Sequence, residues 1–548
     1  MGKRRISTSF LIVFLVVTLA ACTSNGSGSS GSNSSSTSTS TASSSTASSS
    51  ASSSASTAMQ SSATGSVTAP AAKYEEIPCP TTNVAGLDAL NFPAGVTCGY
   101  LIVPENRAKP DGRQIRIFFS RAPAVTATGQ EPLVWLAGGP GGAGSFNVAS
   151  MVAKGVNADR DVIFVDQRGT LHADPLLPCP EVDQFENDTV DLPMAAVSTT
   201  TLDTAAYQAC RDRLAATGVD LASYNTTENA ADIADLRVAM GIVSWNVYGV
   251  SYGTRLALSL LRDHPEGIKS MVLDSVSPPV NNIVDTWWSA PASSFKAIFA
   301  ACEAQPACAA AYPNLAADFT DTVNRLNTTP LVVQTQDSAG APVTVNIDGF
   351  ALAYAVINAS EKFDPAAIPM MVGDIAKGDG QGIATVLLNL LNPPTTVGLA
   401  GVGLGLTVFC QESENLTTEA EALATAKSYL PDFPDDVLKL QPKRGRLFTE
   451  CPVWDVGKAD PSVIAPTVSD VPVLVLEGAF DAATAPEWVD LITPDLPNSQ
   501  VVTFPMTGHS VVPKSSCGLN LLTSFLADRM QKVDGSCVDQ TLLTFKTG

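Results

Sequence analysis

A serine flanked by two glycines is the first indication of chemistry in this sequence. Ser251 lies in the stretch "GVSYG", residues 249–253, which has the form G-x-S-x-G and occurs once in the chain. A strand-like run, "WNVY", precedes it, and an apolar, helix-like run, "TRLALSLL", follows it. This context is typical of a serine held on a strained strand-to-helix turn, where glycines on both sides let the backbone pass close by. We therefore predict that Ser251 is a nucleophile.

A serine hydroxyl needs a base to take its proton, and histidine is suited to that role near neutral pH. The chain contains three histidines, His172, His264 and His509. His264 ends the helix-like run that begins after Ser251, so we expect it at the far end of that helix. His172 follows "DQRGTL" in a predicted loop. His509, in "PMTGHSVV", comes directly after the last predicted strand, and we predict that it is the base.

The imidazole of a catalytic histidine must be held in one tautomer by a carboxylate. Asp481 ends the strand-like run "VPVLVLEGAF" and lies 28 residues before His509. Asp274, which closes an earlier strand-like run, is the alternative, and we interpret it as mainly structural. The order Ser251, Asp481, His509 is that of the α/β-hydrolase fold.

The loop "LAGGPGGAGSF" allows two interpretations. Gly139, Gly141 and Gly144 match G-x-G-x-x-G, the dinucleotide fingerprint, and Asp166 follows about 20 residues later, where a ribose contact is expected. The same glycines could instead bring backbone N–H groups to an oxyanion that forms only in a transition state.

The predicted nucleophile favours the oxyanion hole. We expect the backbone N–H groups of Gly139 and Tyr252 to form it, and we expect no cofactor. Asp166 and Arg168 are then interpreted as a structural pair that braces the glycine loop.

Apolar, β-rich runs alternate along the chain with helix-like stretches such as "NAADIADLRVAMGI". Several runs are continuously apolar, as strands buried on both faces of a parallel sheet are. The alternation predicts an α/β fold. The predicted strands are "IRIFFSRA", "PLVWLAG", "DVIFVDQRG", "WNVYGVS", "KSMVLDSV", "PVLVLEGAFD" and "QVVTFPMTGH".

One long interval interrupts this alternation. Residues 280–470 are mostly helix-like, with loops rich in Gly, Pro and Thr. We predict that they form a mainly helical cap domain inserted between two strands of the sheet. Residues 73–279 and 471–548 then form the two parts of the core.

The N-terminal region predicts export. Basic residues at positions 3–5 precede an apolar run at 10–17, and the run ends in "LAAC", which resembles a bacterial lipobox. We expect residues 1–22 to be a lipoprotein signal peptide and Cys22 to carry lipid; an ordinary signal peptide is the alternative. Residues 23–72 are almost wholly Ser, Thr, Ala and Gly, which predicts a disordered tether. The expected location is outside a bacterial cell membrane, with the lipid as the only membrane contact.

The cysteines fit an oxidising compartment. The chain has 11, and removing Cys22 leaves an even number that could form disulfides. Metal binding is weakly supported, because the chain has no C-x-x-C motif and only three histidines. Sequence alone does not determine connectivity, but the remaining cysteines fall into neighbours along the chain: Cys79 with Cys98, Cys179 with Cys210, Cys302 with Cys308, Cys410 with Cys451, and Cys517 with Cys537.

The net charge argues against one class of partner. It is −21 at pH 7, whereas phosphate binding needs concentrated Lys and Arg, so we expect no nucleic-acid partner. The sequence gives no indication of an oligomeric state.

As a set, the motifs resemble a known family. The sequence resembles prolyl and tripeptidyl aminopeptidases of the α/β-hydrolase superfamily in six features. They are "GGPGG" after a strand, "DQRG" after the next, "GVSYG", a late Asp, "GH" and the tail "KSSCGLNLLTSFL". The resemblance spans most of the chain from about Cys79 onward, including the C-terminal region of exported tripeptidyl aminopeptidases. Two departures are Ala137, where relatives often have His, and "DAATAP", which has one residue more than the usual D-x-x-T-P.

This resemblance implies a serine exopeptidase that cleaves near the free N-terminus of short peptides. The inserted domain would cap the site and supply acids for the substrate ammonium. Glu412 and Glu414 are the candidates, because Cys410, Gln411 and Glu412 resemble a C-x-D stretch of the family. A carboxylesterase with the same triad is the alternative, and an inactive binding protein is a further one.

Overall fold

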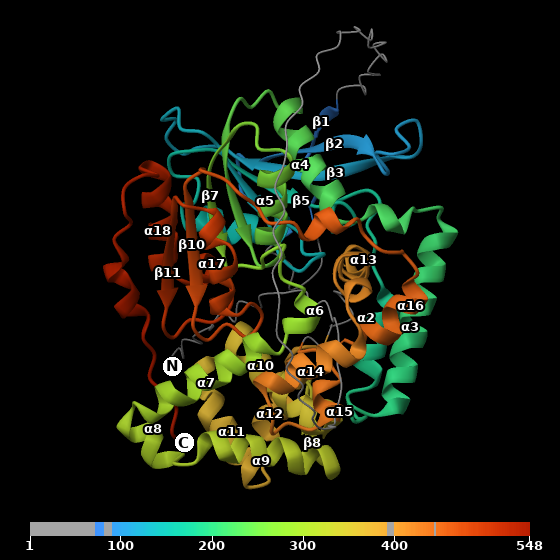
Figure 1. The fold of residues 1–548 in the computed structure, drawn as a ribbon, viewed down its shortest axis with the longest axis vertical. Coiled ribbons are helices and arrows are strands. Elements are labelled where there is room, and N and C mark those ends of the chain that lie inside the picture. Colours follow the sequence, from blue (N-terminus) through green and yellow to red (C-terminus); the bar gives the residue numbers. More distant parts are fainter. Residues whose placement is uncertain (1–71, 82–89, 392–398, 443–444) are drawn as a thin grey trace, which may run out of the picture. The chain divides into compact units, whose positions relative to one another are not determined.

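A nine-stranded sheet forms the centre of the α/β part of the chain (Figure 1). The computed structural model describes residues 72–81, 90–391, 399–442 and 445–548. Strands β1, β2, β3 and β5 pair antiparallel, and from β5 to β11 every neighbouring pair is parallel. In spatial order the strands are β1 (Lys73–Ile77), β2 (Thr97–Pro104), β3 (Gln114–Ala122), β5 (Val162–Asp166), β4 (Leu133–Leu136), β6 (Trp245–Val250), β7 (Ile268–Asp274), β10 (Val473–Gly478) and β11 (Ser499–Phe504).

Both faces of this sheet are buried along its central strands β4, β5, β6 and β10. On β4, Val134 and Leu136 belong to one hydrophobic cluster, whereas Leu133 and Trp135 belong to another. Side chains alternate between the faces of a strand, so a strand covered on both sides must be apolar throughout. This explains the continuously apolar runs in the sequence and confirms the predicted α/β class.

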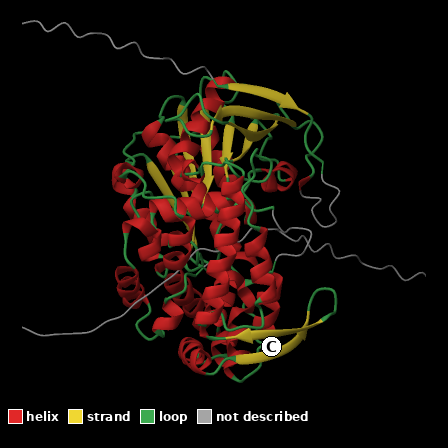
Figure 2. Cartoon of the chain, turned by 90° about the vertical axis from the view of Figure 1, so that its right-hand side faces the viewer, coloured by secondary structure: helices red, strands yellow, loops and turns green. Residues whose placement is uncertain are grey.

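Helices supply the covering layers (Figure 2). Helices α3, α4 and α5 contribute to the first cluster, and α1, α17 and α18 contribute to the second. The helices outside the inserted segment are α1 (Ser145–Ala153), α2 (Pro180–Asp188), α3 (Val197–Ala216), α4 (Thr226–Ala239), α5 (Tyr252–Asp263), α17 (Val511–Lys514) and α18 (Ser516–Ala527).

Between β7 and β10 the chain is mainly helical, as predicted for residues 280–470. The exception is an antiparallel hairpin of β8 (Leu331–Gln336) and β9 (Pro342–Ile347), which is separate from the large sheet. The helices are α6 (Ile283–Thr286), α7 (Ser289–Glu303), α8 (Pro306–Ala311), α9 (Leu315–Thr328), α10 (Gly349–Lys362), α11 (Ile368–Ala376), α12 (Gln381–Asn389), α13 (Val402–Glu412), α14 (Glu419–Tyr429), α15 (Asp435–Leu438) and α16 (Leu447–Trp454).

The inserted segment contacts the core near two functional loops. Ser294 Oγ of α7 donates to the carbonyl oxygen of Phe480, 2.8 Å away, one residue before Asp481. At the start of α13, the N–H of Gly401 donates to the carbonyl oxygen of Gly141 in the glycine loop, 3.3 Å away. That the inserted segment forms a cap domain of its own stays a prediction.

All seven predicted strands are present, but four strands were not predicted. β1 reads "KYEEI" and lies at the sheet edge, where its charged residues are exposed or half-buried, so it lacks an apolar signal. β8, "LVVQTQ", has three apolar residues followed by three polar ones, β9, "PVTVNI", alternates from Val343 onward, and the two form only a two-stranded sheet. β2, "TCGYLIVP", was also missed.

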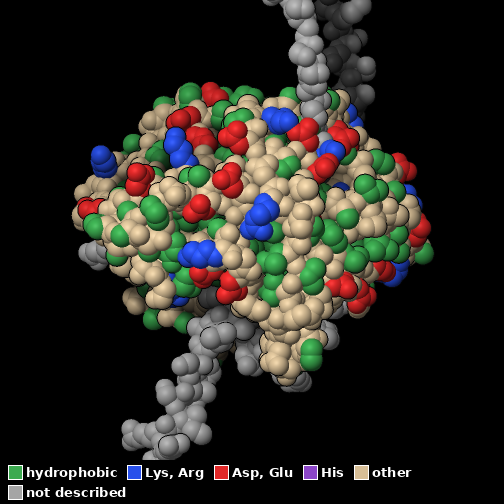
Figure 3. Space-filling model, turned by 90° about the horizontal axis from the view of Figure 1, so that it is seen from below, with side chains coloured by type: hydrophobic (Ala, Val, Ile, Leu, Met, Phe, Trp, Pro, Cys, Tyr) green, Lys and Arg blue, Asp and Glu red, His purple; other side chains and the backbone are tan. Residues whose placement is uncertain are grey.

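The structure contains the five neighbouring disulfides: Cys79–Cys98, Cys179–Cys210, Cys302–Cys308, Cys410–Cys451 and Cys517–Cys537. The predicted signal peptide, Cys22 and all of the predicted tether at 23–72 except its last residue lie outside the described residues. Within the part of the chain that is described, no helix combines the length and apolar character that crossing a bilayer requires. On the face shown in Figure 3, acidic and basic side chains are interspersed.

Candidate active site

Ser251 lies on a tight turn between β6 and α5. Its φ is +59° and its ψ is −128°, in a region that L-residues rarely adopt. A Cβ on Gly249 would clash with the carbonyl oxygen of Gly253, and a Cβ on Gly253 would clash with that of Leu136. The two glycines of G-x-S-x-G are therefore required by close backbone contacts, and the turn leaves Ser251 half-buried.

The glycine loop packs directly against this turn. A Cβ placed on Gly138 would lie 2.7 Å from Ser251 Cβ and 2.8 Å from the carbonyl oxygen of Val250. Gln167 Nε2 donates to the carbonyl oxygen of Ala137, 2.8 Å away, which ties the start of the loop to the "DQRG" segment. The loop is thus next to the serine, as an oxyanion hole requires. The role of the Gly139 and Tyr252 N–H groups stays a prediction.

The structure joins the predicted base to the predicted acid. His509 Nδ1 lies 2.7 Å from Asp481 Oδ2. The Asp481 side chain is fully buried, whereas the His509 side chain is 15% exposed. A ring held this way by a carboxylate keeps its other nitrogen free for proton transfer.

The turn after Asp481 completes its hydrogen bonding. The N–H groups of Ala483 and Thr484 donate to Oδ1 at 2.8 and 2.9 Å, and Thr484 Oγ1 donates to Oδ2 at 2.9 Å. Burial alone would raise the pKa of Asp481, but the His509 ring and the two N–H groups outweigh it and lower the pKa to about 2. Thr484 was not selected from the sequence, although the nearby "D-x-x-T" pattern pointed to it.

The other two histidines occupy different surroundings. His264 is at the opposite end of α5 from Ser251, about 18 Å away for a helix of this length. His172 Nδ1 lies 2.9 Å from Asp166 Oδ2. The contact of His172 is of the same kind as the contact between His509 and Asp481, but the surroundings differ: the His172 ring packs against Phe92 and Phe118, and its Nδ1 also lies 3.3 Å from Ser145 Oγ. The choice of His509 as the base stays a prediction.

The interpretation of Asp166 and Arg168 as a pair is wrong. Asp166 accepts from the N–H and hydroxyl of Ser145 at 2.8 and 2.9 Å, besides its contact with His172. Arg168 instead makes a two-pronged contact with Asp232 of α4, at 2.8 Å for each hydrogen bond. β5 ends at Asp166 and Arg168 lies in the turn that follows, so the two side chains reach different partners. Asp166 still braces the end of the glycine loop.

Glu412 has surroundings that do not support the predicted amine contact. Its side chain is buried, and Thr226 donates to both oxygens through its N–H and hydroxyl, each at 2.8 Å. Arg255 Nε lies 3.5 Å from Oε2 and supplies a positive charge. Burial raises the pKa of Glu412, and Arg255 and Thr226 oppose that rise. Because Glu412 already has a protein cation, its contacts favour a structural role, and its contact with a substrate amine stays a prediction.

Glu414 differs from Glu412 in this respect. It begins a short 3₁₀ turn, Glu414–Leu416, just after α13 and is half-buried. Among the described residues, no ion pair or hydrogen bond involves its carboxyl group. Burial therefore raises its pKa to about 7. A cation on a bound ligand would therefore stabilise the ionised form of the Glu414 carboxyl.

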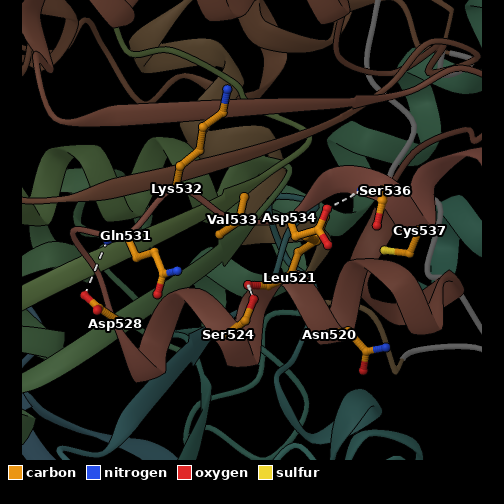
Figure 4. Close-up of a pocket in the computed structure, with 10 residues that line it drawn as sticks. All are labelled: Asn520, Leu521, Ser524, Asp528, Gln531, Lys532, Val533, Asp534, Ser536 and Cys537. Carbon is orange, nitrogen blue, oxygen red and sulfur yellow. Dashed lines mark hydrogen bonds between the residues drawn. The ribbon is translucent and has the colours of Figure 1, made fainter.

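One cavity of about 390 Å³ lies away from these residues (Figure 4). Residues in and after α18 line it: Asn520, Leu521, Ser524, Asp528, Gln531, Lys532, Val533, Asp534, Ser536 and Cys537. None of the candidate catalytic residues lines it, so we do not assign it to the active site. Within the described ranges, no group of His, Cys, Asp or Glu is arranged to hold a metal ion.

A family model described as "alpha/beta hydrolase fold" matches residues 131–514. The chain belongs to the α/β-hydrolase fold family. The match includes Ser251, Asp481 and His509, and it also includes the whole inserted segment.

Among curated proteins, this α/β hydrolase is similar to peptidases. It is 32% identical over 216 residues to a "Tripeptidyl aminopeptidase" of Streptomyces coelicolor, covering 36% of this chain and 38% of that protein. It is 29% identical over 217 residues to the "Serine protease Hip1" of Mycobacterium tuberculosis, covering 37% and 40%. The matches thus span about two fifths of the length of these relatives.

Two solved structures match most of the chain at low sequence identity. A proline iminopeptidase of Mycobacterium smegmatis is 17% identical, with a TM-score of 0.37 over 79% of this α/β hydrolase and 98% of that chain. A thermophilic esterase from Thermogutta terrifontis is 13% identical, with a TM-score of 0.35 over 79% and 99%.

Proposed function

We propose that this protein is a serine exopeptidase that cleaves peptide bonds near the free N-terminus of short peptides. Ser251 is the nucleophile, His509 the general base and Asp481 the residue that orients the base. The observation that carries this proposal is the 2.7 Å contact between His509 and Asp481, in a chain whose single G-x-S-x-G serine lies on a strained turn.

In acylation, Ser251 Oγ attacks the carbonyl carbon while its proton passes to His509 Nε2. The His509 Nδ1–H remains donated to Asp481, which stabilises the imidazolium. Backbone N–H groups of Gly139 and Tyr252 hold the oxyanion of the tetrahedral intermediate. The C–N bond then breaks as Nε2 gives its proton to the leaving amine.

Deacylation repeats these steps with water as the nucleophile. Water gives a proton to His509 and attacks the ester carbonyl. The ester C–O bond breaks, Ser251 Oγ regains the proton, and the released acid is the N-terminal fragment. Both half-reactions use the same three side chains.

The choice of an exopeptidase rests on two supports. The similar proteins named above include a tripeptidyl aminopeptidase, and Glu414 offers a half-buried carboxyl that no cation among the described residues contacts. A substrate ammonium loses hydration when it enters a capped site, so it needs a carboxylate there. We assign Glu414 to that contact.

We also propose that the protein is exported and held to the outside of a bacterial membrane by lipid on Cys22. The N-terminal sequence motifs and the five disulfides support export, because disulfides persist mainly in oxidising compartments. The capped site would then act on short extracellular peptides.

The test compares three substrates with the wild-type protein and Ser251→Ala. These are a chromogenic tripeptide amide, its N-acetylated form and a simple aryl ester. We expect the free tripeptide amide to be cleaved fastest and Ser251→Ala to lose about 10⁴-fold or more in kcat. Fast ester hydrolysis with neither peptide cleaved would instead indicate a carboxylesterase. No turnover of any substrate would favour a binding protein.

A further inference from the structure

Asp274 lies at the end of β7, between the turn that carries Ser251 and the loop that carries His509. It is fully buried, and neither the peptidase chemistry nor the ring-holding role of Asp481 requires it. Its hydrogen bonds nevertheless reach both catalytic segments.

The main chain of Asp274 holds the serine. β6 and β7 pair in parallel, with Val250 beside Asp274. The next N–H along, that of Ser251, donates to the carbonyl oxygen of Asp274, 2.9 Å away. The sheet ladder thus extends one residue into the strained turn and fixes the backbone of the nucleophile to the end of β7.

The side chain of Asp274 holds the segment after the histidine. The N–H of Val511 donates to Oδ1 at 2.7 Å, and the N–H of Val512 donates to Oδ2 at 2.8 Å. These are free N–H groups of the first turn of α17, so the carboxylate caps this short helix. A third donor, Tyr248 Oη, lies 2.6 Å from Oδ2.

Ser275 adds a bond to the same segment. The N–H of Ser510 donates to Ser275 Oγ, 2.9 Å away. Both serines have positive φ, +61° for Ser275 and +68° for Ser510, which non-glycine residues adopt only when their surroundings require it. Three consecutive N–H groups after His509 are therefore bound by two consecutive residues at the end of β7, Asp274 and Ser275.

We propose that Asp274 is a positioning residue that sets the distance between Ser251 Oγ and the His509 ring. Asp481 holds the ring by its Nδ1, but a side-chain contact alone leaves the ring free to move with its backbone. Asp274 removes that freedom, because its carbonyl oxygen holds the backbone of Ser251 and its carboxylate holds the backbone after His509. The inference rests on the proposed roles of Ser251 and His509.

Replacing Asp274 with Asn tests the carboxylate. Each oxygen of Asp274 accepts from a backbone N–H, so either orientation of an Asn amide places its NH₂ group against one of them. Tyr248→Phe is the matched control, because it removes a bond to the same carboxylate without touching the His509 loop. Ser275→Ala is a second, milder variant that keeps the carboxylate and removes the bond from Ser510 together with the long 3.4 Å bond from Ser275 Oγ to Asp274 Oδ1.

The readouts are the rate at which a fluorophosphonate labels Ser251, kcat and KM on the tripeptide amide, and the thermal unfolding midpoint. We expect Asp274→Asn to slow labelling and kcat by about 10- to 100-fold with KM within about twofold, since small misplacements of reacting groups have effects of that size. Ser275→Ala should slow both by about 3- to 10-fold, an order-of-magnitude expectation on the same basis. Tyr248→Phe should keep labelling close to wild type, even where its unfolding midpoint falls.

The outcomes separate the two proposals. Wild-type protein that is not labelled at Ser251 would overturn the assignment of the nucleophile. The positioning role would be overturned if the wild type is labelled at Ser251 and folded Asp274→Asn is labelled at the same rate. Equal slowing in Tyr248→Phe would also overturn it, since general stability would then explain the loss. If Asp274→Asn does not fold, Ser275→Ala is the test of the positioning role. A wild-type labelling rate in Ser275→Ala would then contradict the proposal.

Discussion

His509 Nδ1 lies 2.7 Å from Oδ2 of Asp481, a carboxylate that is fully buried. A buried carboxylate is unfavourable unless it is paired, and here the ring and the N–H groups of the following turn keep it ionised. This contact has consequences for both stability and catalysis.

The pKa of about 2 for Asp481 predicts a pH-dependent contribution to stability. Because the folded pKa lies below the unfolded value, the contribution is present above about pH 4 and is lost as the pH falls towards 2. Asp481→Asn should therefore lower the free energy of unfolding most at pH 5 to 7, by about 2 kcal/mol, and progressively less towards pH 2.5. Denaturant unfolding at each pH measures this. A difference that grows on acidification would contradict the ionised state of Asp481.

Gly138→Ala should strongly reduce activity. The new Cβ would lie 2.7 Å from Ser251 Cβ, so either the serine turn or the glycine loop must move. We expect kcat to fall about 100-fold, the typical effect of losing oxyanion-hole geometry. Gly535→Ala is the control, because its nearest atom outside the chain neighbours is 3.9 Å away. Steady-state kinetics on the tripeptide amide measures both, and wild-type kcat in Gly138→Ala would place the oxyanion loop elsewhere.

Glu414→Gln should reduce the preference for a free α-amine. The measured quantity is the ratio of kcat/KM for the free tripeptide amide to that for its acetylated form, in which the titration of the shared catalytic base cancels. Because burial raises the pKa of Glu414 to about 7, its ionised fraction rises from pH 6 to 7.5, and the wild-type ratio should rise with it. In Glu414→Gln the ratio should be about tenfold lower, a loss of ~1.4 kcal/mol, and flat with pH.

Glu419→Gln is the control for this test. Glu419 is an exposed acid in the first turn of α14, so its loss changes the net charge equally without altering a half-buried carboxyl. An unchanged ratio in Glu414→Gln, or an equal drop in Glu419→Gln, would remove Glu414 from the amine site.

The disulfide between Cys410 and Cys451 should stabilise the inserted segment, because it links α13 to α16 across a separation of 41 residues. Replacing both cysteines with Ser should lower the free energy of unfolding by about 2–4 kcal/mol. The same change at Cys302 and Cys308, separated by only 6 residues, should have an effect about 1–2 kcal/mol smaller if chain entropy dominates. Non-reducing calorimetry compares the two, and equal losses would argue for a local, enthalpic effect.

Local patterns in the sequence determined much of this protein. Apolar, β-rich runs identified seven strands, and several of these runs are continuously apolar because burial on both faces of a parallel sheet requires it. The G-x-S-x-G turn selected Ser251, and position after a strand selected Asp481 and His509. Neighbouring cysteines anticipated the five disulfides, since short separations along the chain already bring them close.

Only the tertiary structure decided which polar groups meet across distant segments. In the structure Arg168 binds Asp232 and not Asp166. Glu412 binds Thr226 and Arg255, which are 186 and 157 residues away in the sequence. The tertiary structure also placed the Asp274 carboxylate under the N–H groups of Val511 and Val512. The physical reason is that a buried charge must find partners wherever packing brings them, and no local spacing records which distant strand or helix will supply them.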